Sequence, residues 1–311
     1  MKDNKAIHTL KNSWKILKNS FSDFGSNRPM IHAGTTAYFA IFSIVPMLIL
    51  IIAVFGIFVD DAVIRNKLFN EINSLLGDRS SELLKEAINN YEITENTTLG
   101  SIVGIAFFLF FATTLFSILQ DTMNYIWRVR VKSSFKMNLL NILKTRFFSF
   151  GIILSLGFVL LASLLIDVAI SFLKDFLSTY FTEKFVILAQ LLNYVLSFGI
   201  ITSIFALIFR YLPDVQVKWS SGWFAAVFTS LFFILGKFAI GFLIGRSDMG
   251  AIYGAAGSII ILLMWVYYVS LIFYFGVELS CQHAKYYRHS NKPVHYAERF
   301  EIVQENPDKK K

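Results

Sequence analysis

Six long stretches of the chain carry almost no charged residues, and polar segments separate them. They cover residues 33–59, 96–120, 147–173, 185–209, 219–245 and 249–277. Each stretch exceeds the roughly 20 apolar residues that an α-helix needs to cross a bilayer core about 30 Å thick. The pattern therefore predicts an all-α fold, a polytopic integral membrane protein in which residues 32–280 form a bundle of six transmembrane helices.

The N-terminal segment, residues 1–31, has the pattern of an amphipathic helix. Apolar residues recur there at helical spacing, while Lys11, Lys15 and Lys18 share another face. Such a helix can lie in the membrane interface with its lysines toward the lipid headgroups. We expect a surface anchor on the cytoplasmic side; a gate or a partner-docking helix is the alternative.

Residues 60–95 between the first two stretches are too many for a structureless loop. Two apolar stripes of helical period run through the segment, and Gly77 and Asp78 divide them. We expect an extracytoplasmic helical hairpin that lays its apolar faces on the bundle or on the membrane surface. The polar residues 281–311 are expected to form a cytoplasmic tail with a disordered end.

Composition and charge support this topology. The chain is 55% hydrophobic and only 16% charged, whereas soluble domains are about a quarter charged. Residues 1–32 contain 6 Lys or Arg and 2 Asp or Glu, while residues 60–95 contain 4 basic and 8 acidic residues. This asymmetry places both termini in the cytoplasm. We therefore attribute the net charge of +8 to topology and anionic lipids, and exclude nucleic acid as a partner.

Patterns typical of an enzyme are missing from the sequence. There is no G-x-x-x-x-G-K-[ST] loop for a nucleotide. The histidines show no metal-ligand clustering, and His283 and His289 are six residues apart, which does not stack them on one helical face. The single cysteine, Cys281, excludes an internal disulfide. We expect no catalytic residues, no cofactor and no metal, and hence a protein that is not an enzyme.

Ionisable residues within the apolar stretches are the candidate functional residues, because charges are costly inside a membrane. Asp167 and Lys237 fall roughly 10 and 8 Å outward of the midplane at 1.5 Å per residue. We hypothesise that they face a polar cavity and contact a substrate or coupling ion; a structural ion pair or two snorkelling side chains are the alternatives. Glu278, at the inner boundary of the sixth stretch, is a candidate for the same pathway or an ordinary interfacial carboxylate.

Proline and small residues mark candidate hinges and packing sites. Pro46 lies near the middle of the first stretch, where a kink is expected. Small residues permit close approach of membrane helices, so the glycines of the last two stretches predict tight packing between them. The alternative is a broken or re-entrant start to the sixth stretch. These glycines are Gly236, Gly241, Gly245, Gly250, Gly254 and Gly257.

Several motifs in order resemble those of the YihY/BrkB family of bacterial inner-membrane proteins. They include Ala33-Gly-Thr-Thr-Ala-Tyr38 with Pro46, Arg210-Tyr-Leu-Pro213-Asp, Gly236-Lys237, Tyr253-Gly254 and Gly276-Val-Glu278-Leu. The resemblance implies six spans, cytoplasmic termini and a bacterial inner membrane. The family was formerly labelled ribonuclease BN, a label generally regarded as mistaken. Other members have been linked to serum resistance and to envelope lipid export, so the resemblance implies transport.

These observations lead to one functional hypothesis and two alternatives. The chain is expected to act as a transporter or flippase that moves an envelope lipid or another amphipathic molecule between leaflets. A small-ion or solute channel or transporter is the first alternative, and a non-transporting scaffold for envelope assembly is the second. Membrane lipids and envelope-assembly proteins are the expected partners, and the sequence leaves the oligomeric state undefined.

Overall fold

The structure is a computed structural model that describes residues 2–94, 98–132, 151, 184–246, 256–289 and 291–301. These residues contain eight α-helices and one small sheet. The predicted all-α class is thus confirmed for these residues. The first five helices are α1 (Lys2–Ser26), α2 (Pro29–Phe55), α3 (Asp61–Leu76), α4 (Asp78–Thr94) and α5 (Thr98–Ile126). The others are α7 (Lys184–Tyr211), α8 (Trp219–Arg246) and α10 (Ala256–Tyr286). Strands β1 (Val129–Val131) and β2 (Ala297–Arg299) pair antiparallel.

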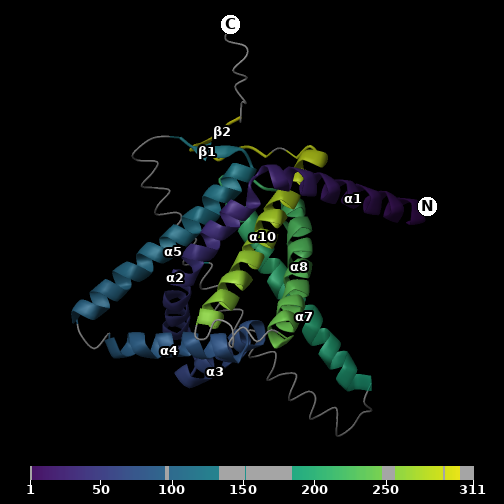
Figure 1. Cartoon of the computed structure of the whole chain (residues 1–311). Helices are drawn as coiled ribbons and strands as arrows, with labels where there is room; N and C mark the ends of the chain where they lie inside the picture. The colour runs from purple at the N-terminus through teal and green to yellow at the C-terminus, as the bar shows by residue number, and fades with distance from the viewer. Residues whose placement is uncertain are drawn as a thin grey trace.

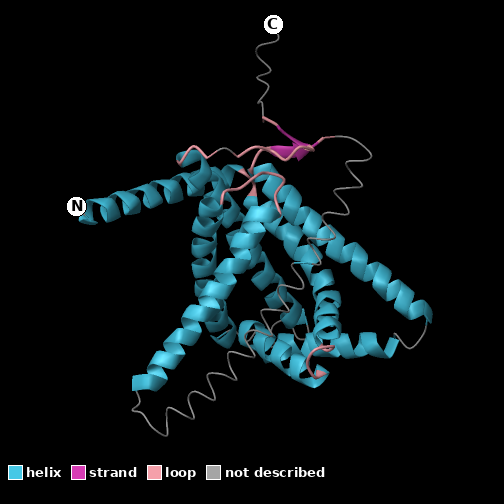
Figure 2. Ribbon diagram, turned by 180° about the vertical axis from the view of Figure 1, so that it is seen from behind, coloured by secondary structure: helices cyan, strands magenta, loops and turns pink. Residues whose placement is uncertain are grey.

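The helices form a bundle with two different ends (Figure 1). Helix α1 and the β1–β2 sheet lie at one end, which we call the terminal end because the first and last described elements lie there. Helices α3 and α4 cross the other end, which we call the opposite end. Helices α2, α8 and α10 run between the ends, whereas α5 and α7 diverge from them toward the opposite end, as the view from behind also shows (Figure 2).

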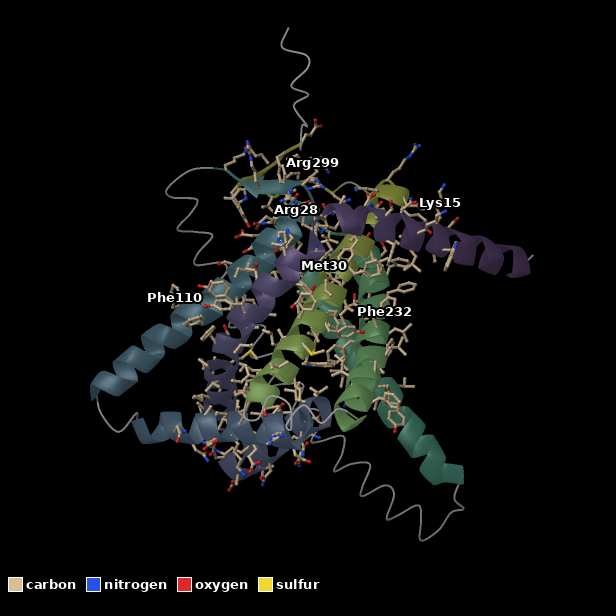
Figure 3. All side chains as sticks on the ribbon, viewed as in Figure 1. Lys15, Arg28, Met30, Phe110, Phe232 and Arg299 are labelled. Atoms are coloured by element: carbon tan, nitrogen blue, oxygen red, sulfur yellow. The ribbon has the colours of Figure 1, made fainter. Side chains whose placement is uncertain are left out.

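Four of the described helical segments are long and apolar enough to cross a membrane: Pro29–Phe55, Tyr194–Tyr211, Trp219–Ile240 and Ala256–Tyr286. Side-chain nitrogen and oxygen atoms gather at the two ends of the bundle, with Arg28 and Arg299 at the terminal end and the apolar Phe232 between the ends (Figure 3). The chain is therefore a membrane protein with several apolar helices. Of the six predicted spans, α5 occupies the second, and the third lies outside the described residues apart from Gly151. The count of six stays a prediction.

Two clusters of buried apolar side chains hold the helices together. One, near the terminal end, includes Phe209 of α7 and Tyr274 and Val277 of α10. The other includes Leu84 and Ile88 of α4 and packs α3 and α4 against α2 and α10. The apolar stripes of residues 60–95 thus cover the ends of the long helices.

Local signals fix several helix ends. The Asp60 carboxylate accepts a hydrogen bond from the Ala62 amide at 2.8 Å and caps α3, and Gly77, with φ 80°, separates α3 from α4. Three arginines adopt the left-handed conformation, which is uncommon for a residue with a Cβ: Arg28 (φ 51°), Arg128 (φ 56°) and Arg288 (φ 48°). Each lies within two residues of a helix that ends at the terminal end.

The helix bounds differ from the predicted stretches in a consistent way. Helix α2 begins at Pro29, four residues before the predicted start at 33, because proline suits the first helical turn. Helix α5 continues six residues past 120 and α10 nine residues past 277. The extra turns are polar, and their side chains find partners inside the protein. The first part of the predicted tail, Cys281 included, is therefore helical and buried.

Candidate functional site

Buried and half-buried polar side chains gather where α1, α2, α5 and α10 meet at the terminal end. We call this group the terminal polar layer. It comprises Asn27, His32, Gln120, Thr122, Asn124, Asp214, Tyr274, Glu278, Gln282 and Tyr296. Because buried polar groups are costly without hydrogen bonds, the partners of each group determine what the layer can do.

Glu278 is the most buried of the sequence-predicted candidates, with only 1% of its surface exposed. The Asn27 amide donates to its Oε2 at 2.8 Å, and the Gln282 amide donates to its Oε1 at 2.9 Å. Gln282 follows one turn later on α10, which places both side chains on one face. No Lys, Arg or His nitrogen lies within 4.0 Å of this carboxylate in the described part of the chain. Neutral amides, not a cation, hold it.

Asn27 links this carboxylate to a second helix. Its side-chain oxygen accepts a hydrogen bond from Nη2 of Arg128 at 2.8 Å, just past the end of α5. Gln282 also donates to the carboxylate of Asp23 on α1, and the Lys285 ammonium lies 3.9 Å from Asp23. A continuous chain of polar contacts therefore joins α1, α5 and α10 around the Glu278 carboxylate.

Asp214 forms a second centre, between α7 and α8, and is also 1% exposed. Its carboxylate accepts hydrogen bonds from Gln120 at 3.1 Å and Asn124 at 2.8 Å, which lie one turn apart on α5. The Asp214 amide in turn donates to Asn124 Oδ1 at 2.7 Å. The Tyr296 hydroxyl completes the shell at 2.8 Å. This centre ties α5 and the α7–α8 connection to the chain that follows α10.

Tyr296 stays a hydrogen-bond donor to Asp214 over the whole physiological range. Burial, the hydrogen bond and the negative charge of Asp214 all raise the pKa of the phenol above its usual value. Between the two carboxylate centres, Thr122 of α5 contacts His32 Nδ1 of α2 at 3.3 Å, and Thr36 of α2 shares a hydrogen bond with the Tyr274 hydroxyl of α10. Helices α2, α5 and α10 thus contribute side chains to the layer, and the connections between elements supply the rest.

The other predicted pathway residues lie elsewhere. Asp167 lies outside the described residues, so its pairing with Lys237 stays a prediction. Lys237 projects from α8 near the opposite end, where its ammonium donates to the Ser74 hydroxyl of α3 at 3.2 Å. Lys237 and Glu278 therefore lie at different ends of the bundle. Within the described residues, the predicted pathway residues do not come together in one site.

The hinge and packing candidates are described in part. Pro46 lies inside α2, and the helix continues through it. Gly236 faces the ring of Tyr268 across the α8–α10 contact: a Cβ there would lie 1.9 Å from Tyr268 Cε1. Gly257 is buried near the start of α10. Gly241 and Gly245 lie within α8, but their surroundings, like Gly250 and Gly254 themselves, are outside the described part.

His283 and His289 do not share a helical face, as their spacing predicts, yet the structure brings the centroids of their two imidazole rings within 5.8 Å of each other. Helix α10 ends at Tyr286, and the left-handed Arg288 turns the chain back, with the His289 amide bonded to the Ala284 carbonyl at 2.9 Å. Both imidazoles then reach the buried Ser221 hydroxyl, at 3.0 and 3.2 Å from their Nδ1 atoms. The spacing carried no signal of this proximity, because the turn after α10 creates it.

Sequence reasoning also missed most of the polar layer. Gln120 and Asn124 form an i, i+4 pair at the end of an apolar stretch, and that spacing is a signal for a shared buried partner. Asp214 ends the Arg210-Tyr-Leu-Pro-Asp motif but was given no role. Asn27 carries no signal in the sequence, because its two partners lie far from it in the chain, just past α5 and on α10.

Comparison with known proteins agrees with a membrane bundle of this kind. The family model Virulence factor BrkB matches residues 20–299. A UPF0761 membrane protein of Aeromonas salmonicida is 27% identical over 276 residues, covering 88% of this chain and 89% of its own length. A UPF0761 membrane protein of Vibrio campbellii is 29% identical over 259 residues, covering 82% and 77%. No solved structure matches the chain. The match runs from α1 to β2 and includes the whole terminal polar layer, so this chain belongs to the BrkB family of membrane proteins.

Proposed function

We propose that this protein moves an envelope lipid or another amphipathic molecule between the leaflets of the bacterial inner membrane and catalyses no chemical reaction. The terminal end faces the cytoplasm in this proposal, and the α3–α4 pair lies on the outer side. Six spans cross the membrane, and membrane lipids are the first partners. The basic residues of β1 and its flanks support this orientation, since Arg128, Arg130 and Lys132 all lie at the terminal end.

The buried carboxyl group of Glu278 is the observation that carries the proposal. An ionisable side chain inside a membrane bundle is costly and usually has a role in a substrate or proton pathway. Two neutral amides bind this one, so its charge is not neutralised by a fixed cation. Such a carboxyl can bind and release a proton, which would couple movement of a substrate to an ion gradient in a chain without a nucleotide-binding loop.

Protonation of Glu278 would change the contacts between helices. The ionised carboxylate accepts from Asn27, at the α1–α2 turn, and from Gln282, on α10. A protonated carboxyl accepts these hydrogen bonds less strongly, because charge-assisted bonds are about twice as strong as neutral ones. The link from α1 to α10 would therefore weaken, and the terminal end could open while α3 and α4 hold the opposite end.

Reconstituted vesicles that contain a labelled phospholipid provide the test. We expect wild-type protein to accelerate exchange of the label between leaflets, and an imposed pH gradient to change the rate. Glu278→Gln keeps the shape of the side chain but removes the titratable proton, and should abolish the dependence on the gradient. Ser280→Ala is the matched control: its hydroxyl is equally buried on α10 and makes no hydrogen bond within the described residues.

Three results would contradict the proposal. Leaflet exchange equal to that of protein-free vesicles, across several lipid classes, would point to a scaffold for envelope-assembly proteins. Ion flux without lipid movement would point to an ion transporter or channel. Equal loss of activity in Glu278→Gln and Ser280→Ala would mean that the layer serves only to hold the fold.

A further inference from the structure

A cationic site lies outside the terminal polar layer, where α7 ends and α8 begins. We call it the α7–α8 corner. It consists of Arg210, Tyr211, Lys218, Trp219 and Trp223. None of these residues contacts the Glu278 or Asp214 carboxylates.

The guanidinium of Arg210 is held in one orientation. Its Nη1 donates to the Val217 carbonyl at 2.6 Å. Its central carbon lies 4.6 Å from the Trp219 ring centroid and 5.4 Å from that of Tyr211. Cation–π contacts on two rings and a backbone hydrogen bond leave the planar group little freedom. An arginine fixed in this way loses little entropy when it binds an anion.

Arg210 also has donors to spare. A guanidinium carries five N–H donors, and the described part of the chain provides a partner for one. Nε is buried without a hydrogen bond, and the described residues give Nη2 no hydrogen-bond partner. No carboxylate of the described residues forms an ion pair with Arg210; the nearby Asp214 is bound by Gln120, Asn124 and Tyr296 instead. Lys218, which is exposed, adds a second positive charge.

The aromatic residues of the corner face away from the bundle. Tyr211, Trp219 and Trp223 are 44%, 40% and 42% exposed, which is high for such large rings. Tyrosine and tryptophan at the end of a membrane helix lie at the level of the lipid headgroups. Exposed apolar side chains continue from Trp223 along the same helix at Val227, Leu231, Leu235, Phe238 and Phe242. The α8 surface is therefore a long apolar stripe that begins at two cations.

We propose that the α7–α8 corner binds the phosphate group of an anionic phospholipid, whose acyl chains lie along the α8 stripe. The fork of Arg210 suits two phosphate oxygens, Lys218 adds a point charge, and the aromatic rings contact the glycerol region. An anionic lipid fits better than a zwitterionic one, because the corner has two cations and no acid. The proposal does not depend on transport: a lipid bound here can be a permanent boundary lipid as well as a substrate.

Native mass spectrometry of the purified protein in detergent tests the proposal. Phosphatidylglycerol and phosphatidylcholine with identical acyl chains are added separately, and the bound fraction is measured against lipid concentration. We expect preferential binding of phosphatidylglycerol. Arg210→Gln should weaken it about ten-fold, as expected for the loss of a charge-assisted hydrogen bond, and Lys218→Gln should weaken it less. Millimolar inorganic phosphate should not compete, because it cannot occupy the apolar stripe.

Arg288→Gln is the matched control, an exposed arginine at the same end of the bundle that has no aromatic contact within the described residues. It should retain the binding of wild-type protein. If Arg210→Gln fails to fold, as judged by gel filtration, Lys218→Gln and Arg210→Lys still carry the test. Equal binding of the two lipids, equal loss in Arg288→Gln, or displacement by inorganic phosphate would each overturn the proposal.

Discussion

A methyl group at position 236 has no room in the packing of α8 against α10. An added Cβ would lie 1.9 Å from Cε1 of Tyr268 and 2.3 Å from its Cζ. Carbon atoms in contact lie about 3.5–4.0 Å apart, so the Tyr268 ring would have to move by roughly 1.5 Å. The ring hydroxyl donates to the Phe232 carbonyl at 2.7 Å, and the ring stacks on Trp265 with centroids 6.2 Å apart. Displacing the ring would weaken both contacts.

The expected size of the effect follows from these contacts. Overpacking costs about 1–3 kcal/mol. The lost hydrogen bond adds about 1 kcal/mol and the weakened aromatic pair about 0.5–1.5 kcal/mol. Alanine is a better helix former than glycine, which offsets about 1 kcal/mol. We therefore expect Gly236→Ala to reduce the free energy of unfolding by about 1.5–4.5 kcal/mol.

Thermal unfolding of the purified variants in one detergent measures this. Gly199→Ala in α7 is the control, because a Cβ there meets nothing within 4 Å. It should unfold at or above the wild-type temperature. Adding Tyr268→Leu to Gly236→Ala should recover part of the loss, with a favourable coupling of about 1 kcal/mol or more. A Gly236→Ala protein that unfolds with the wild type, or a double variant without coupling, would refute the packing argument.

Two further predictions concern the terminal end. Asp214→Asn replaces an accepting carboxylate oxygen with an NH2 donor that faces the donors of Gln120, Asn124 and Tyr296, and should destabilise the protein by about 1–3 kcal/mol. Asp60→Asn is the control: asparagine still caps α3, so the unfolding temperature should change little, and equal effects of the two substitutions would count against the assigned network. Burial and the positive charge of Lys218 lower the pKa of His289 in the folded protein. The neutral imidazole therefore stabilises the fold at pH values above the unfolded-state pKa of about 6.5, and this stabilisation is lost as the pH falls from there toward the folded-state pKa. Unfolding temperatures measured from pH 7.5 to 5 should therefore fall less steeply in His289→Gln, and identical profiles would contradict this assignment.

Hydropathy alone was sufficient to predict the class of the fold and the approximate place of most described helices, because long apolar runs leave few options in a membrane. Gly77 was identified correctly as the break between α3 and α4, since glycine tolerates the positive φ found there. The stripe of Leu84 and Ile88 indicated the buried face of α4. These are all local signals.

The polar layer could be predicted only in small part, because its contacts join distant segments. Glu278 attracted attention as a charge beside an apolar run, yet its partner Asn27 lies 251 residues away in the sequence. Asp214 is bound by residues 90 and 94 positions before it and 82 positions after it. The hydropathy pattern predicted ends for α5 and α10 that are too early, because a polar helical turn is normally exposed to solvent. Here the polar last turns are buried against one another.

The pairing of β1 with β2 has a consequence for how the protein is made. Arg130 faces Glu298 in this sheet, and Tyr296 reaches Asp214 just before it. At about 5–20 residues per second, the polar last turns of α5 leave the ribosome on the order of 10–30 s before Tyr296 is synthesised. For that interval Gln120 and Asn124 have no complete set of partners. Final assembly of this end therefore waits until Tyr296 has been made, and a chain truncated before residue 296 would lack both the β1–β2 pairing and the Tyr296–Asp214 hydrogen bond.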